Sequence, residues 1–488
     1  MPKNVLLVSL PAPAVEQTRE EKDYWKWHYA LKTRLTYNNL SEKQLLNLGN
    51  IENQNIGLLS IASVLRDNGV NVQYLAPSLD FRGSQREREF LEAVIYQVNE
   101  NEFDFLGFSS HTCGIPAAIS YSREVKNARP RIKTVIGGPH ANGTGEDTLS
   151  ELLENFDFVI RGKGEIPFLG LINGNQNSIG ISYKKGNRKN ITPISDISPS
   201  KYPDPANDLL NIDELPAARV FASLGCRKDA QCVFCGDTLH NKGFLARPVE
   251  EVLREIKYFY DNLGTRYIYF GDENFFFNKE RALQLMEEVN SSDLDITFGH
   301  QVRVESADKE LIKKAAESGK CTEMQYGVES ASQAVLNLCK KGLRIQRVRE
   351  ICDLTKSYGI STHCNFLVGL PGETQETAEL TIEKMEELIK DGSVDFVEYR
   401  CVIPFPGAPM WEFADRYGVK IKHRNWKQYR GENRPPFDLK NLTSEEIYEF
   451  YLEGLRRVTG LYEKRYLREF GDDISDINVL SAVIEGGF

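Results

Sequence analysis

The sequence of 488 residues lacks the marks of several protein classes. No apolar run approaches the roughly 20 residues that a membrane-spanning helix needs. The amino-terminal run at residues 4–9 is short and has no signal-peptide cleavage pattern, so it predicts a first strand instead. No basic run is present and the net charge is −10, which argues against nucleic acid as the main partner.

The sequence also lacks a disulfide framework, because its nine cysteines are odd in number and mostly scattered. This pattern favours a reduced, cytoplasmic protein. The composition, 41% hydrophobic and 27% charged, is that of an ordinary globular chain. The length suits two or three domains.

What the chain does have is three cysteines within ten residues, Cys226, Cys232 and Cys235, with the aromatic Phe234 directly before the last. Thiolates are soft ligands that favour zinc or iron–sulfur clusters. A structural zinc site needs four ligands, and no fourth cysteine lies nearby. Ordinary iron–sulfur clusters take four cysteines. Three local cysteines therefore suit a cubane cluster in which one iron stays open to another ligand.

The alternative is a zinc knuckle in which His240, beyond Cys235, supplies the fourth ligand. Such spacing is a weak signal when it stands alone. The surroundings favour the cluster, because residues 218–223 have the pattern of a short buried strand and a helix is expected from Pro248. The cysteines then occupy the loop after a strand's carboxyl end, where barrel enzymes build their sites.

Strands and helices alternate along the first 160 residues. This alternation predicts an α/β fold with a parallel, doubly wound, Rossmann-like sheet. Residues 15–50, which are charged and aromatic, are expected to form a surface helix, with a lid near a ligand as the alternative. The expected strands are 4–9, 70–75, 103–109, 133–136 and 156–160, and the expected helices are 57–67, 85–100, 117–127 and 146–154.

Three loops of this sheet follow strand carboxyl ends, where such sheets bind their ligands. Their glycines allow a backbone to approach a large ligand closely, although for any single glycine a tight turn is an equal explanation. The loops suggest a bound cofactor without identifying it. The candidate residues are Ser109, Ser110, Gly137, Gly138, Pro139, His140, Gly162, Gly164 and Glu165.

A second alternating series begins near Ala218, after an expected hairpin at 181–194 and a linker at 199–205. Six strands with helices between them predict a partial (β/α)6 barrel with ligands at the strand ends. We expect three parts: residues 1–200, the barrel at 201–410 and a mostly helical segment at 411–488. The expected barrel strands are 220–223, 267–270, 296–301, 323–328, 361–368 and 396–403, and the expected helices are 249–262, 280–290, 309–317, 345–358 and 374–390.

These features resemble the cobalamin-dependent radical S-adenosylmethionine enzymes over about residues 1–410. The cysteine motif of that family is usually Cys-x3-Cys-x2-Cys. Here the first gap is five residues, 227–231, while the Cys-x-aromatic-Cys end is kept. A loop can lengthen in this way at little entropic cost. The resemblance implies a [4Fe–4S] cluster on the three cysteines, whose open iron binds S-adenosylmethionine.

The resemblance extends, in the right order, to segments that follow the later barrel strands. Residues 271–275 match the place where the family binds the methionine ammonium, and a carboxylate suits this cation because the bond is charge-assisted. Segments 302–305, 327–332, 366–373 and 403–409 match the motifs that follow. Taken singly, Arg303 could be a paired structural arginine and Glu329 a surface carboxylate. The implied S-adenosylmethionine contacts are Phe234, Asp272, Glu273, Arg303, Glu329, Ser330 and Gly369.

The loops of the first sheet are similar to the cobalamin-binding half of the family, which implies that their nine candidate residues contact cobalamin. Many cobalamin proteins ligate cobalt with the histidine of Asp-x-His-x-x-Gly. His140 has Gly143 three residues later, but Gly138 stands where the aspartate would be. Without that carboxylate the imidazole lacks the partner that would orient it as a metal ligand. We expect no histidine on cobalt, with His140 near the corrin.

The resemblance implies that the cofactors carry the difficult chemistry while the protein places them and excludes water. The first expectation is a C-methyltransferase for an unactivated carbon of a small-molecule or natural-product substrate. One alternative is a radical cyclase, ring-contraction or oxidative rearrangement enzyme. A non-catalytic metal- or cobalamin-binding protein is another, but it leaves Asp272, Arg303, Glu329 and Gly369 without a shared purpose. The expected protein partner is an electron donor such as flavodoxin or ferredoxin.

Overall fold

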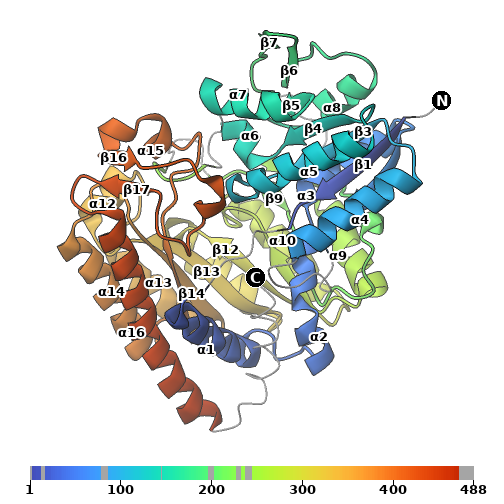
Figure 1. Ribbon diagram of the computed structural model, residues 1–488. Helices are drawn as coiled ribbons and strands as arrows, with labels where there is room; N and C mark the ends of the chain where they lie inside the picture. Colours follow the sequence, from blue (N-terminus) through green and yellow to red (C-terminus); the bar gives the residue numbers. More distant parts are fainter. Residues whose placement is uncertain are drawn as a thin grey trace.

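The computed structural model describes residues 3–11, 17–77, 86–143, 145–195, 203–226, 232–236 and 244–471. Two α/β units lie side by side, the amino-terminal sheet at the upper right of Figure 1 and a second, curved sheet at the lower left. None of the described helices is both long enough and apolar enough to cross a membrane.

The first unit is a seven-stranded sheet with the order β2-β1-β3-β4-β5-β6-β7. Its first five strands are parallel, as predicted, and the expected hairpin extends the edge as two antiparallel strands. Strand β1, between β2 and β3, is buried from Val5 to Ser9, as a strand covered on both faces should be. The strands are β1 (Asn4–Ser9), β2 (Asn71–Leu75), β3 (Phe105–Ser109), β4 (Lys133–Gly137), β5 (Phe158–Ile160), β6 (Ile181–Lys185) and β7 (Arg188–Asn190).

Helices cover both faces of this sheet (Figure 1). Two of them, α6 and α8, start in the candidate loops and were not predicted. The helices are α3 (Ile56–Asp67), α4 (Arg86–Glu100), α5 (Ile115–Ala128), α6 (Pro139–Gly143), α7 (Glu146–Asn155) and α8 (Glu165–Ile172).

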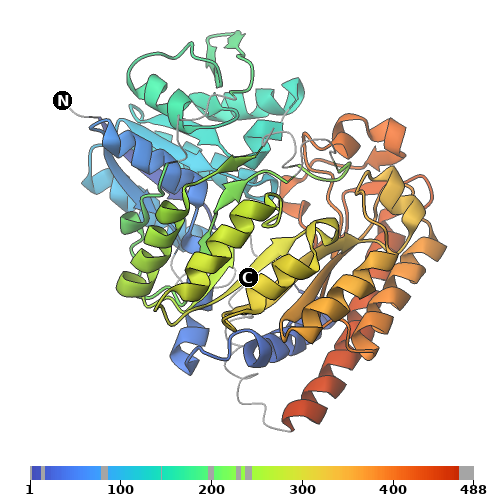
Figure 2. The ribbon, with the colours of Figure 1, turned by 180° about the vertical axis from the view of Figure 1, so that it is seen from behind.

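The second unit is a six-stranded parallel sheet with the order β15-β14-β13-β12-β11-β8. The two outer strands do not pair with each other, so the sheet is the predicted partial barrel. Figure 2 shows its helices covering the outer face. The elements are β8 (Ala217–Val220), β11 (Tyr267–Phe270), β12 (Thr297–Val302), β13 (Cys321–Glu329), β14 (Ser361–Val368), β15 (Phe396–Cys401), α9 (Val249–Leu263), α10 (Lys279–Ser291), α11 (Lys309–Ala316), α12 (Gln333–Leu338), α13 (Gln346–Ser357) and α14 (Gln375–Lys390).

The first barrel strand lies earlier than predicted. It ends at Val220, and the next residues turn away to form β9 (Ser223–Leu224), which pairs with β10 (Leu245–Ala246). The cause is Asp272, whose carboxylate accepts the Ala222 N–H at 2.9 Å and also the Ser223 hydroxyl. These bonds replace the ladder bonds that a longer strand would have made.

The prediction of a surface helix for residues 15–50 is wrong. Helix α1 (Arg19–Leu35) is largely buried, with Tyr24 and Leu31 almost fully enclosed. It packs against the last helix, α16 (Ser444–Phe470), and lies at the amino ends of β13 and β14 (Figure 1). Its aromatic side chains are therefore core residues, and α1 closes one end of the barrel.

A buried ion pair fixes α1 to the barrel. The Lys32 Nζ lies 3.1 Å from Glu323 Oε1, and the His363 Nδ1 lies 2.9 Å from the same oxygen. Burial alone would raise the pKa of the Glu323 carboxyl, but the Lys32 ammonium and the His363 ring outweigh burial and hold it well below its usual range. The Tyr267 hydroxyl donates to the other oxygen at 3.2 Å. Both carboxylate oxygens of Glu323 therefore have hydrogen-bond or ionic partners, although the side chain is fully buried.

The carboxyl-terminal segment is mostly helical, as predicted, and also holds a small two-stranded antiparallel sheet that was not predicted. Helix α16 packs on α14 and β15, and the Val397 N–H donates to the Tyr462 hydroxyl at 2.5 Å. The three-part division at residues 200 and 410 stays a prediction. The elements are α15 (Pro409–Glu412), β16 (Val419–Ile421), β17 (Phe437–Leu439) and α16.

The ion pair yields a stability prediction. We expect Glu323→Ala to lower the free energy of unfolding by about 3–5 kcal/mol, because it leaves the Lys32 ammonium buried without a counter-charge. The double variant Lys32→Met, Glu323→Gln removes both charges and should cost much less. Urea denaturation measures both variants. A single variant that loses less than the double one would contradict this account.

Candidate functional site

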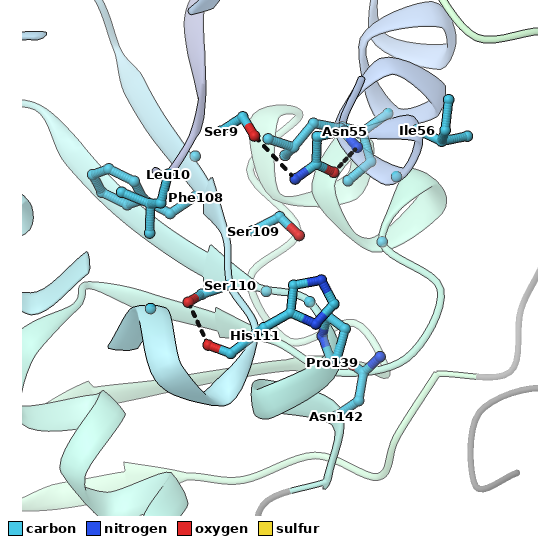
Figure 3. Close-up of a pocket in the computed structure, with 18 of the residues that line it drawn as sticks. Ser9, Leu10, Asn55, Ile56, Phe108, Ser109, Ser110, His111, Pro139 and Asn142 are labelled. Carbon is cyan, nitrogen blue, oxygen red and sulfur yellow. Dashed lines mark hydrogen bonds between the residues drawn. The ribbon is translucent and has the colours of Figure 1, made fainter. Parts of the chain in front are cut away.

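A cavity of about 690 Å³ lies beyond the carboxyl ends of the first sheet (Figure 3). The three predicted loops all contribute to it, after β3, β4 and β5. Its size is within the range of small-molecule and cofactor sites. Of the nine candidate residues, the eight that line the cavity are Ser109, Ser110, Gly137, Gly138, Pro139, Gly162, Gly164 and Glu165.

Two loop glycines are required by packing between the loops. Gly138 has φ +96°, and a Cβ there would lie 2.7 Å from the Ser109 Oγ and from the Ser110 nitrogen. Gly162 has φ +93°, and a Cβ there would meet the Ser195 carbonyl oxygen at 1.9 Å. Both positions favour glycine on conformation and on space. They shape the rim of the cavity, and their need for glycine is explained without a ligand.

One buried acceptor does point to a ligand. The Glu165 Oε2 lines the cavity region, is buried and has no hydrogen-bond partner among the residues that the structure describes. Burial raises the pKa of Glu165, and the nearby Lys163 ammonium opposes this only in part. A buried acceptor without a partner is costly, so a ligand N–H would stabilise it. The amide groups around a corrin ring supply such donors, and the cavity residues fit cobalamin in this respect.

His140 is the one candidate that the structure places away from the cavity. It is buried, its Nδ1 lies 3.1 Å from the Thr112 Oγ1, and its ring meets Trp426 edge-on at 5.0 Å between centroids. Burial lowers its pKa to about 4. The sequence analysis did not single out His111, which is exposed and lines the cavity beside Pro139 (Figure 3).

The cavity continues to the barrel. Phe221 and Leu224, which follow β8, line it together with Arg219 and with Arg430 from the carboxyl-terminal segment. Leu224 stands two residues before Cys226, so their Cα atoms are at most about 7 Å apart. The cavity and the cysteine loop therefore share a wall.

One arginine from outside the cysteine loop lies close to two of its three thiols. The Arg303 Nη1 lies 4.0 Å from the Cys226 Sγ and 3.8 Å from the Cys232 Sγ. The other guanidinium nitrogen donates to the Lys341 carbonyl. Burial raises the pKa of the Cys226 thiol, and the Arg303 charge opposes that effect. Arg303 is thus placed to offset thiolate charge. The Cys235 N–H donates to the Cys232 carbonyl at 3.1 Å in the same loop.

Three thiols on one loop beside a guanidinium suit an iron–sulfur cluster, because thiolates are its usual ligands. In the part of the chain that the structure describes, no three His, Cys, Asp or Glu side chains meet closely enough to hold a metal ion as they stand. The fit of these residues to an iron–sulfur cluster therefore rests on the chemistry of the three thiols and on the Arg303 guanidinium that two of them share. His240, the fourth ligand of the zinc alternative, lies outside the described residues.

The two carboxylates after β11 hold the cysteine loop. Asp272 is buried and accepts from Ala222 and Ser223, and the Glu273 Oε2 accepts the Gly225 N–H at 2.7 Å. Burial raises the pKa of Asp272 to about 6. These bonds leave further lone pairs on each carboxylate. The predicted contact with a methionine ammonium remains a proposal.

The candidate residues of β13 lie beside the same loop. Glu329 is buried and pairs with the Lys341 Nζ at 2.5 Å, so it is not a surface carboxylate. Its φ is +73°, which is unusual for a residue other than glycine, and such strain gathers at functional sites. Ser330 is buried, and its hydroxyl accepts the Ser332 N–H at 3.1 Å.

The turn after β14 is built on a buried acid. Gly369 has φ +89° and donates its N–H to the Glu373 Oε2 at 2.5 Å. Burial raises the pKa of Glu373 to about 8, although two backbone N–H groups of the turn oppose that shift. Phe234 is partly buried and packs against the main core. The candidate S-adenosylmethionine residues thus come from the cysteine loop and from the carboxyl ends of β11 to β14.

A row of polar side chains lines the concave side of the barrel, and the sequence analysis missed it. The Tyr269 hydroxyl on β11 donates to the Gln325 Oε1 on β13 at 3.1 Å, across the intervening strand β12. The Asn365 Oδ1 is buried and has no partner among the described residues. Polar residues at every second strand position were the available signal. The partly exposed members are Arg219, Tyr269, Gln301, Gln325, Asn365, Glu398 and Arg400.

Comparison with known proteins agrees with this geometry. Residues 220–385 match the radical SAM superfamily, and residues 50–172 match the B12 binding domain. The chain is 30% identical over 358 residues to an uncharacterized methyltransferase of Pyrococcus horikoshii, which covers 70% of this chain and 76% of that protein. It is 24% identical over 393 residues to the anaerobic magnesium-protoporphyrin IX monomethyl ester cyclase of Rubrivivax gelatinosus, covering 73% and 68%.

A similar solved structure is that of the radical S-adenosylmethionine methyltransferase TsrM from Kitasatospora setae, with tryptophan substrate and an S-adenosylmethionine analogue bound. The TM-score is 0.62 at 14% identity, and the match covers 86% of this chain and 77% of that one. At this identity the likeness shows the shared fold.

The position of His140 leads to a spectroscopic prediction. We expect the cobalt(II) form of the cobalamin-loaded protein to show no hyperfine splitting from a protein nitrogen in electron paramagnetic resonance. The spectra of His140→Ala and His111→Ala should match that of the unaltered protein. Nitrogen splitting that disappears in either variant would show that a histidine binds cobalt. Splitting that persists in both would come from the base of the cofactor itself.

Proposed function

The chain belongs to the cobalamin-dependent radical S-adenosylmethionine enzymes, and we propose that it methylates an unactivated carbon of a small molecule. The observation that carries this proposal is the wall that the cavity and the cysteine loop share at Phe221 and Leu224. When bound, the cluster and S-adenosylmethionine supply a radical that removes hydrogen, and cobalamin supplies a methyl group. Direct methyl delivery needs the two sites to be adjacent.

The residues of the chain provide placement and charge. In this proposal, Cys226, Cys232 and Cys235 hold the cluster while Arg303 offsets thiolate charge, and Asp272 fixes the loop through Ala222 and Ser223. Preorganised groups of this kind avoid reorganisation during the reaction. The proposed S-adenosylmethionine contacts are Phe234, Asp272, Glu273, Arg303, Glu329, Ser330 and Gly369.

The substrate is proposed to lie in the barrel. Helix α1 closes the amino end of the strands, so a substrate must approach from the carboxyl ends, where the cavity lies. Gln325 and Asn365 offer amide groups there, and the unpaired Asn365 Oδ1 would accept a substrate N–H or O–H. A chamber closed by α1 also excludes water from a radical reaction.

Radical cyclisation or rearrangement is the second candidate. The similarity to the magnesium-protoporphyrin IX monomethyl ester cyclase favours it, because that protein matches most of the chain. The motifs described above serve both reactions. The relative from Pyrococcus horikoshii, which has the higher identity, is named a methyltransferase, and this supports methyl transfer as the first choice.

We also propose a location and a redox partner. No disulfide joins any of the nine cysteines, all of which lie among the described residues, and this suits the reducing cytoplasm. A cluster held by Cys226, Cys232 and Cys235 would need an electron from outside the chain before each cleavage of S-adenosylmethionine. A flavodoxin or a ferredoxin is the proposed donor.

The stoichiometry of the nucleoside products tests methyl transfer. A methyltransferase that abstracts hydrogen uses S-adenosylmethionine twice, once as the radical source and once to remethylate cobalt. We expect one 5′-deoxyadenosine and one S-adenosylhomocysteine for each methylated product. Anaerobic incubation of the reconstituted protein with candidate metabolites, followed by mass spectrometry, measures all three. Product with 5′-deoxyadenosine but without matching S-adenosylhomocysteine would favour cyclisation or rearrangement.

A further inference from the structure

Two surface segments flank the cysteine loop. The Val233 N–H donates to the Cys339 carbonyl at 3.0 Å, and the Met410 N–H donates to the Val233 carbonyl at 2.9 Å. The loop after α12 and the start of α15 therefore lie on the two sides of Val233. Figures 1 and 2 both show α12 and α15 as neighbours at one edge of the molecule.

Large apolar side chains are exposed on these segments. Leu338, next to Cys339, is 45% exposed, Phe405 is 36% exposed, and Phe413, one turn after Met410, is 59% exposed. Phe405 lies beside the loop, because a Cβ on Gly236 would be 3.8 Å from the Phe405 Cβ. Apolar groups gathered in this way mark an interaction site more often than isolated ones do.

Two cations follow Leu338 in the chain, and Phe413 is flanked by the exposed residues Glu412, Asp415 and Arg416. Lys340 and Arg344 are exposed, and neither pairs with a carboxylate of the described residues. Lys340 precedes Lys341, whose carbonyl accepts from the arginine that contacts the thiols. The net charge of the whole chain is −10, so the chain as a whole repels a partner protein that is itself acidic. Local cations are what can steer such a partner to this face.

We propose that Leu338, Lys340, Arg344, Phe405 and Phe413 form a docking surface for flavodoxin, a small acidic flavin protein. This rests on the proposed function, because only a chain that cleaves S-adenosylmethionine reductively needs such a donor. In the transfer, the reduced flavin loses one electron and the cluster gains it, with no bond made between the proteins. Redox encounters use interfaces under about 1,200 Å², which suits a small mixed patch.

The test uses cleavage of S-adenosylmethionine without substrate, driven either by flavodoxin with its NADPH-dependent reductase or by dithionite. The variants are Leu338→Ser with Phe413→Ser, and Lys340→Glu with Arg344→Glu. At low flavodoxin concentration, we expect each pair to slow 5′-deoxyadenosine formation by about tenfold, since the surface acts on association. The dithionite-driven rate should stay within about twofold, because dithionite needs no docking surface.

Matched controls come from two other helices, α16 and α11. Leu467→Ser on α16, an exposed apolar residue, and Lys313→Glu on α11, an exposed cation, should leave both rates unchanged. Iron content should be the same in all variants. Added salt should slow the unaltered protein with flavodoxin and affect the charge-reversed pair little.

Each other outcome overturns the proposal. Equal losses with dithionite would mean that the residues act on the cluster, and equal losses in the controls would mean that no defined surface exists. In a third arm with ferredoxin as the donor, losses there but not with flavodoxin would name a different occupant. If the unaltered protein forms no 5′-deoxyadenosine even with dithionite, the proposed function itself fails.

Discussion

The constraint on which the rest of the structure depends is the short path from β8 to the first cysteine. β8 ends at Val220, Phe221 and Leu224 line the large cavity, and Cys226 follows at once. Asp272 holds this path in place by accepting from two of its residues. Because the carboxyl ends of both sheets meet there, a cofactor in the cavity and a cluster on the cysteines would be neighbours. Neither unit could shift without separating them.

At both ends of the barrel, a buried cationic side chain lies beside groups that carry, or can carry, negative charge. At the carboxyl end, the Arg303 guanidinium faces two thiols, and at the amino end Lys32 and His363 share Glu323. Arginine suits the first position, since its planar group can serve several acceptors at once and keeps its charge when buried. The contacts of Glu323 with Lys32 and His363 fix α1 against β13 and β14.

Much of the fold could be predicted from the sequence, because strands and helices each leave a regular local pattern of hydrophobic residues. The cavity loops were found because glycine and polar residues follow the strands. The position of α1 could not be found, because its aromatic residues suit a surface helix equally well and its pairing with Glu323 joins distant parts of the chain. The early end of β8 depends on Asp272 in the same way. The loop alone predicts that His140 lies near the corrin, whereas in the structure His140 contacts Thr112 and does not line the cavity.

The central claim is that one chain holds an iron–sulfur cluster on the three cysteines beside a separate cobalamin site. The most direct measurement is the iron, zinc and cobalamin content of the anaerobically reconstituted protein and of the variant with Cys226, Cys232 and Cys235 all changed to Ala. The account predicts the iron of one [4Fe–4S] cluster with bound cobalamin in the unaltered protein, and loss of the iron with cobalamin retained in the variant. Iron that persists in the variant, or zinc in place of iron in the unaltered protein, would contradict it.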